Sequence, residues 1–200
     1  MNVRTPLLCF ALLLPLLSGA AEEGREESLY ERRPARESYV DGETGVTLPP
    51  RIGRFRKTEV VRNFNPLIGT VVRYSDPDGN CGDVYIYSLS GAERTLTQAD
   101  ARAHFRTIHR AIVNLPKKSS QVTEVLPLEE KDLNEPPNVF GRSALFRIRI
   151  AGDFRTSELT VFPFGSKIVK LRISSSPYAP KDEDLSYFTK AVCTAFNAVR

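Results

Sequence analysis

Apolar and polar residues alternate along three stretches in the second half of the chain. This period of two is typical of antiparallel strands that turn one side toward a core. Arg147 and Arg149 take the polar phase of the first stretch, and Lys170 and Arg172 take that of the last. Gly-containing turns separate the stretches, so we predict that they form consecutive hairpins. The three predicted strands are 144–150, 156–163 and 168–173.

Four further strands are predicted before these three. The turn at 76–80 is rich in Asp, Asn and Gly, and it joins the second and third of the predicted strands as a hairpin. A polar loop at 128–140, with two consecutive prolines, is expected after the fourth. The four strands are 55–64, 69–74, 83–89 and 121–126.

Two segments show the helical period instead. In the first, Thr97 and Asp100 resemble a capping box, and Pro116 is expected to end the helix. Its apolar stripe consists of Ala101, Phe105, Ile108, Ile112 and Leu115. The second helix is predicted over 182–199. Its stripe consists of Leu185, Phe188, Val192, Ala195 and Val199.

The element order predicts an α+β fold with a mostly antiparallel sheet of about seven strands, βββαββββα, and two amphipathic helices. This order over 46–200 resembles the PsbP-like fold of an extrinsic photosystem II subunit and of DcrB-type periplasmic proteins. The opening Leu48-Pro49-Pro50 with Ile52-Gly53, followed by 67–74 and 83–87, also resembles a group of exported bacterial proteins of unknown function. PsbP-like proteins are mostly assembly or binding factors, so the resemblance implies a binding role.

The N-terminus has the three parts of a secretory signal peptide. Arg4 supplies a basic start, an apolar run covers 6–17, and small residues follow at 18–21. We therefore predict a signal peptide at 1–21 and a protein exported to the bacterial periplasm or secreted, with no transmembrane segment after cleavage. Residues 22–45 are charged and lack a sustained apolar period, so we expect a mobile leader before a single domain at 46–200. The net charge of +4 thus combines an acidic leader with a basic domain.

Two cysteines, Cys81 and Cys193, lie beyond the predicted signal peptide. Export would place them in an oxidising compartment, where a disulfide can persist. We predict that they form a disulfide, and two free thiols are the alternative.

The sequence shows few groups for catalysis. His104 and His109 are five apart, about 140° around a helix, so they do not share the face that a zinc site needs. The turn at 76–83 resembles a calcium loop, but Cys81 stands where that loop needs Gly, and Tyr87 stands where it needs Glu. A hairpin turn is the favoured interpretation. No P-loop, nucleophile elbow, dinucleotide fingerprint or Cys-x-x-Cys motif occurs, so we expect no metal or cofactor.

A basic sheet face is the predicted binding site. If both helices cover one face of the sheet, the polar phases of several strands meet on the other face. An ordinary solvated face is the alternative interpretation. Basic side chains interleaved with aromatic ones can hold a polyanion, and we expect an anionic envelope component rather than nucleic acid. The residues of this predicted face are Arg147, Arg149, Lys170, Arg172, Tyr85 and Tyr87.

Together these patterns predict an exported, non-enzymatic binding or assembly protein of the cell envelope. Its partner would be an envelope protein or an anionic envelope component. The alternative is a periplasmic enzyme or small-molecule binder, with a site in the loop at 128–140 and the adjacent sheet edge.

Overall fold

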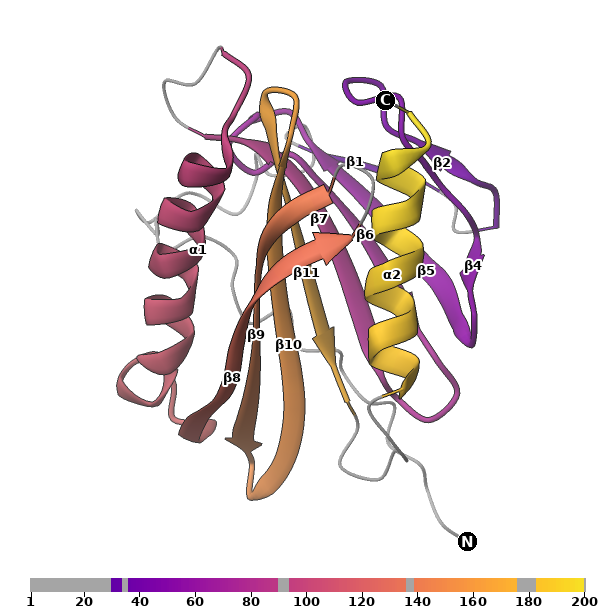
Figure 1. Cartoon of the computed structure of the whole chain (residues 1–200). Coiled ribbons are helices and arrows are strands. Elements are labelled where there is room, and N and C mark those ends of the chain that lie inside the picture. The colour runs from indigo at the N-terminus through magenta and orange to yellow at the C-terminus, as the bar shows by residue number, and fades with distance from the viewer. Residues whose placement is uncertain (1–29, 34–35, 90–93, 136–138, 176–182, 200) are drawn as a thin grey trace, which may run out of the picture.

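The computed structural model describes residues 30–33, 36–89, 94–135, 139–175 and 183–199, and it shows a large sheet between two helices (Figure 1). The sheet has the strand order β1-β5-β6-β7-β11-β10-β9-β8, with β4 added beside β5, and β2 and β3 form a separate pair. All of these pairings are antiparallel. The strands are β1 Tyr30–Arg33, β2 Tyr39–Val40, β3 Thr47–Leu48, β4 Arg51–Ile52, β5 Phe55–Asn63, β6 Thr70–Ser75, β7 Cys81–Ser88, β8 Val122–Glu135, β9 Val139–Ile150, β10 Asp153–Phe164 and β11 Lys167–Ser174.

The α+β prediction is confirmed. Strands β5 to β11 correspond to the seven predicted strands, with helix α1 (Gln98–Val113) after the third and helix α2 (Glu183–Asn197) after the last. Short hairpins join β9, β10 and β11, as the Gly-containing turns predicted. Among the described residues, no helix is both long and apolar enough to cross a membrane.

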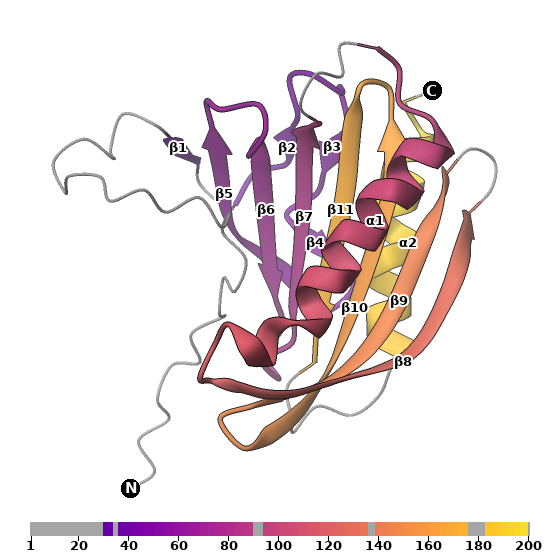
Figure 2. The ribbon, with the colours of Figure 1, turned by 90° about the vertical axis from the view of Figure 1, so that its left-hand side faces the viewer.

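The two helices lie on opposite faces of the sheet, which is the feature that matters most for the site. Figure 2 shows α1 in front of the sheet and α2 behind it. Along β7, Val84 and Ile86 pack into the core under α2, whereas Tyr85 and Tyr87 pack into the core under α1. Each face of the sheet therefore has its own hydrophobic core, and the condition on which the predicted binding face depended, that both helices cover one face, is not met.

Helix α1 begins and ends where the sequence indicates. The Thr97 hydroxyl accepts from the backbone N–H of Asp100 at 3.3 Å, and the Asp100 carboxylate accepts from that of Thr97 at 2.7 Å, which completes the capping box. Pro116 lies in a 3-10 turn, Leu115–Lys117, directly after the helix. Phe105 and Ile112 of its predicted stripe are buried against the sheet.

Helix α2 differs from its predicted stripe at one end. Leu185, Phe188 and Val192 are buried as predicted, but Val199 lies beyond the end of the helix and is 43% exposed. Phe196 is instead fully buried, and its ring packs edge-on against Phe162 and Phe164.

The predicted polar loop at 128–140 is mostly strand, which corrects the sequence interpretation. Strand β8 continues to Glu135 and pairs with β9 along its length. It is an edge strand, and edge strands tolerate charged residues because one side faces water. Arg142 on β9 binds the carboxylates of Glu130 and Asp132 across the pair, which stabilises this polar hairpin.

Part of the predicted mobile leader is also folded. Strand β1 pairs with β5, and β2 pairs with β3. Tyr39 is buried, and its hydroxyl donates to the buried carboxylate of Asp41 at 3.1 Å. Asp41 also accepts from the backbone N–H and hydroxyl of Thr44 at 2.9 and 2.8 Å. The folded domain therefore begins before residue 46, while the predicted signal peptide and residues 22–29 lie outside the described residues.

Candidate functional site

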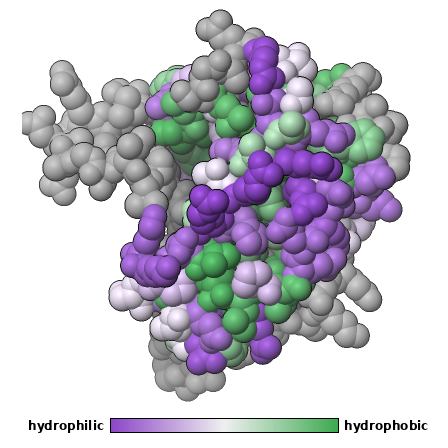
Figure 3. Space-filling model, turned by 60° about the vertical axis from the view of Figure 1, so that its left-hand side comes forward, coloured by the Kyte–Doolittle hydropathy of each residue, from purple (hydrophilic) through white to green (hydrophobic). Residues whose placement is uncertain are grey.

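A groove of about 250 Å³ lies between α1 and the part of the sheet that α1 leaves uncovered. Helix α1 crosses β9, β10 and β11 at an angle, so β5, β6 and β7 extend beyond it (Figure 2). On this side of the molecule, apolar surface is gathered between strongly polar patches (Figure 3). Leu67 and Ile68 form one wall of the groove, and Ile108 and Ala111 of α1 form the other.

The floor of the groove is a row of side chains set by the strand register. Val71 on β6 pairs with Tyr85 on β7, and Tyr85 pairs with Lys170 on β11. Residues paired across antiparallel strands point to the same face, so these three side chains lie together beneath the groove. The Lys170 ammonium lies over the Tyr85 ring, 3.6 Å from its centroid, and 5.9 Å from that of Tyr87. Burial, with a smaller contribution from Arg172, lowers the pKa of Lys170 to about 8, so the amine is mainly cationic at pH 7.

A hydrogen bond joins the sheet to α1 at the groove. The Tyr87 hydroxyl lies 2.6 Å from Nε2 of His104 on α1, and the two rings meet edge to face. Burial lowers the pKa of His104 to about 4, with a smaller effect from Lys170, and burial also raises that of Tyr87. At neutral pH the tyrosine hydroxyl is therefore the donor and the neutral imidazole the acceptor.

A row of alternating charges lies next to the floor. Arg73, Asp83 and Arg172 pair in register on β6, β7 and β11. Burial raises the pKa of Asp83, while Arg73 opposes the shift. The Tyr85 hydroxyl donates to Asp83 at 3.2 Å, and Arg73 also binds Glu59 at 2.7 Å. The Asp83 carboxylate is thus already engaged within the sheet.

The predicted basic face is divided between the two sides of the sheet. Tyr85, Tyr87, Lys170 and Arg172 do lie together on the α1 side. Arg147 and Arg149 lie on the α2 side, where both guanidinium groups cover the Phe154 ring at 4.4 and 4.2 Å from its centroid. The strand register is the reason, because residues paired across antiparallel strands point to the same face. Arg172 pairs with Leu159, and Leu159 pairs with Ala144. Ala144 is therefore on the groove side, and Arg147, three residues later on β9, is on the other side. The six residues therefore cannot form one binding face.

His104 is the groove residue that sequence reasoning set aside. It lies on α1 at the edge of the groove. Only the packing of α1 on the sheet brings it to Tyr87 of β7, which is 17 positions earlier in the chain. His109, on the opposite edge of the stripe, packs against Phe105 and Phe146.

The predicted disulfide between Cys81 and Cys193 is not formed. Cys193 is a free thiol with 1% exposure in the core under α2, where burial raises its pKa to about 12. Cys81 alternates in phase with Asp83 and Tyr85, so it points toward the α1 side of the sheet. The sheet separates the two side chains, which is why the pairing is wrong.

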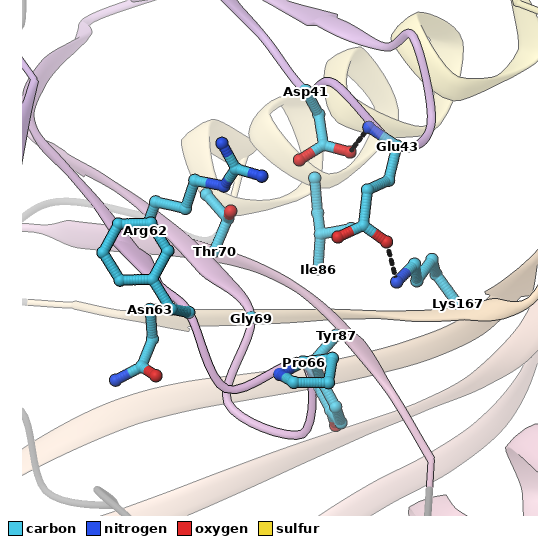
Figure 4. Close-up of a pocket in the computed structure, with 11 residues that line it drawn as sticks. Asp41, Glu43, Arg62, Asn63, Pro66, Gly69, Thr70, Ile86, Tyr87 and Lys167 are labelled. Carbon is cyan, nitrogen blue, oxygen red and sulfur yellow. Dashed lines mark hydrogen bonds and ion pairs between the residues drawn. The ribbon is translucent and has the colours of Figure 1, made fainter. Parts of the chain in front are cut away.

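A second, smaller cavity of about 80 Å³ lies beside the short β2–β3 pair. Figure 4 shows Glu43 facing Lys167 across it, with Asp41 close to the Glu43 backbone. Lys167 also donates to Ser88 at 2.9 Å, and Asp41 accepts the bonds described above. The charged groups named here have partners within the fold. We therefore interpret this cavity as the contact region that holds residues 39–48 against the sheet.

A third cavity, of about 210 Å³, lies near the alternative site at 128–140. Its central group is Glu158, whose Oε1 accepts from the hydroxyls of Ser143, Thr160 and Thr189 at 3.1–3.2 Å. Within the described part of the chain, neither a histidine nor a cysteine lines it.

In the turn at 76–80, the Asp76 carboxylate is used within the turn itself, because it accepts from the backbone N–H groups of Asp78 and Asn80, both at 2.9 Å.

Comparisons with known proteins concern the fold alone. No family model and no curated protein matches the chain. Among solved structures, the chain is similar to the solution structure of cyanobacterial PsbP (CyanoP) from Synechocystis sp. PCC 6803, with 16% identity, a TM-score of 0.46, and coverage of 90% of this chain and 94% of that one. This neighbour has the PsbP-like fold that the element order predicted. We carry no residue role or partner over from it, and the likeness to DcrB-type proteins stays a prediction.

The buried His104 should make stability depend on pH. In the unfolded chain its pKa is near 6.5, whereas in the fold it is about 4. As the pH falls from 6.5 toward 4, the unfolded state takes up a proton that the native state does not, so the free energy of unfolding should fall. Urea unfolding of His104→Gln should show a smaller loss between pH 7 and pH 5 than wild type. His109→Gln serves as the control, and equal losses in wild type and His104→Gln would contradict the assignment.

Proposed function

We propose that this chain is an exported, non-enzymatic binding protein of the cell envelope, and that the groove beside α1 holds a small apolar ligand. The observation that carries the proposal is the groove itself, an apolar hollow with walls from a helix and a sheet. Small-molecule sites are typically concave, mainly apolar and lined by few polar groups. Export rests on the signal-like segment at 1–21, which lies outside the described residues.

The groove supports binding better than catalysis because its polar groups are largely engaged. The Tyr87 hydroxyl and His104 Nε2 bind each other, and the Tyr85 hydroxyl binds Asp83. A general base must be within reach of the proton that it removes, and here Nε2 already accepts a hydrogen bond from the Tyr87 hydroxyl. Among the described residues that line the groove, none carries a carboxylate, a serine hydroxyl or a thiol.

The walls are also held in place, which favours a preformed site. Phe105 and Ile112 anchor α1 to the sheet from its buried side. The Tyr87–His104 hydrogen bond then fixes the side of α1 that faces the groove. A preformed site binds with less loss of conformational entropy than one that must be ordered by its ligand. Leu67 is 48% exposed at the mouth, where a ligand would cover it.

A direct test is titration with 1-octanol, an apolar probe without charge, followed by methyl NMR. We expect saturable shifts at the methyl groups of Ile68, Val71 and Ile108, and small changes elsewhere. Ala111→Phe should abolish these shifts, because the added ring fills the groove from the helix side. Val113→Phe, at an exposed position on the other side of α1, is the matched control and should bind like wild type.

Two outcomes would overturn the proposal. One is the absence of saturable shifts in folded wild-type protein. The other is a dimer, seen by sedimentation, that Ala111→Phe converts to monomer while octanol does not bind. That result would assign the groove to a second copy of the chain instead of a ligand.

A further inference from the structure

We infer that the groove's ligand is an anionic amphiphile, with one carboxylate placed against Lys170 and an apolar body along the helix. This inference rests on the proposed function and names the ligand class for the same site. The inference follows from the position of Lys170, whose ammonium has no anionic partner among the described residues.

Lys170 makes no hydrogen bond or ion pair with any residue that the structure describes. Its ammonium lies over the faces of the Tyr85 and Tyr87 rings. Charges removed from water are normally paired, because burial without a counter-charge is unfavourable. The lowered pKa of Lys170 has the same cause, since burial is its largest contribution.

No described residue supplies an anion in contact with the Lys170 ammonium. Asp83, whose charge raises the pKa of Lys170 slightly, lies in the adjacent row and not among the groove's lining residues. It accepts from Tyr85 and lies in register between Arg73 and Arg172. A carboxylate brought by a ligand could take the place beside the Lys170 ammonium without displacing any of these contacts.

The surroundings limit the ligand to a single negative charge. Lys170 is the one cation that lines the groove within the described part of the chain. Arg172 is two residues along the same strand, about 7 Å away by strand geometry, and it faces Asp83. A doubly charged phosphate would call for a second cation, as clustered Arg sites provide. One ammonium beside Val71, Ile108 and Ala111 instead suits a monocarboxylate with a short apolar chain.

The test compares octanoate with 1-octanol, which share the chain and differ in the head group. Wild type should bind octanoate at least about tenfold more tightly than octanol, because a hydrogen bond to a charged group adds to the shared apolar contacts. Lys170→Met should remove this preference and leave octanol affinity within about twofold. Lys170→Arg should keep it. Lys190→Met, at an exposed position on α2, is the control for overall charge and should behave like wild type.

The outcomes separate the two proposals. If neither probe binds wild type, the proposed function fails. If octanol binds and octanoate binds no more tightly, only the present inference fails. Should Lys170→Met not fold, the side-chain CH₂ resonances next to the Lys170 amine in wild type decide the matter. They should shift with octanoate but not with octanol, and equal shifts with both probes would overturn the inference.

Discussion

Phe188→Ala should lower the free energy of unfolding by about 3–5 kcal/mol, the range for removing a fully buried aromatic ring. Phe188 is 0% exposed and lies where α2 meets the sheet. Its ring centroid is 4.9 Å from that of Phe55 and 5.4 Å from that of Tyr74, the latter edge to face. It also lies against Gly82, where an added Cβ would come within 2.8 Å of the ring. The substitution therefore leaves a cavity lined by large side chains that cannot close over it.

Urea unfolding monitored by circular dichroism would measure this loss. Phe64→Ala is the matched control, because it removes the same ring from a side chain that is 60% exposed. Its effect should stay within about 0.5 kcal/mol. A loss at Phe188 no larger than at Phe64 would show that α2 does not pack on the sheet in this way.

Gly69→Ala should cause the second large loss of stability, for two separable reasons. Gly69 has φ +64°, a conformation that is unfavourable for residues with a side chain by about 1–2 kcal/mol. An added Cβ would also lie 2.0 Å from the carbonyl oxygen of Ile86 and 2.8 Å from Cα of Tyr87. Both neighbouring atoms belong to the backbone of β7, so the strands must move apart. Overpacking of this kind typically costs about 1–3 kcal/mol more.

Gly165→Ala separates the two contributions. Gly165 has φ +59°, but an added Cβ there meets no atom within 4 Å. Gly165→Ala should therefore lose only the free energy that the unfavourable backbone conformation costs. The loss in Gly69→Ala should be larger by about the overpacking cost. Equal shifts in the urea midpoints of the two variants would contradict the close approach of Gly69 to β7. Because Gly69 lies directly after Leu67 and Ile68, octanol binding should also weaken in Gly69→Ala.

The candidate site was partly visible in the sequence. Tyr85 and Tyr87 were grouped with Lys170 and Arg172 because they share a phase on their strands, and the structure confirms that these four lie on one face. The sequence did not indicate the apolar wall at Leu67 and Ile68, because these residues follow a turn and show no periodic pattern. His104 could not be joined to Tyr87, because a contact between a helix and a strand depends on the angle at which they pack.

The period of apolar residues determined most of the seven strands β5 to β11 and the two helices, and the capping box determined where α1 begins, because period and caps are local properties of the chain. The period also determined which residues within one strand share a side. It did not determine which side of one strand matches which side of the next, because register is set by pairing between distant segments. Arg147 and Lys170 look equivalent in the sequence, yet pairing through β10 places them on opposite faces. Tertiary structure alone placed α1 and α2 on different faces, buried Cys193 away from Cys81, and left Lys170 beside an open groove, because each of these depends on how the two helices divide the faces of the sheet.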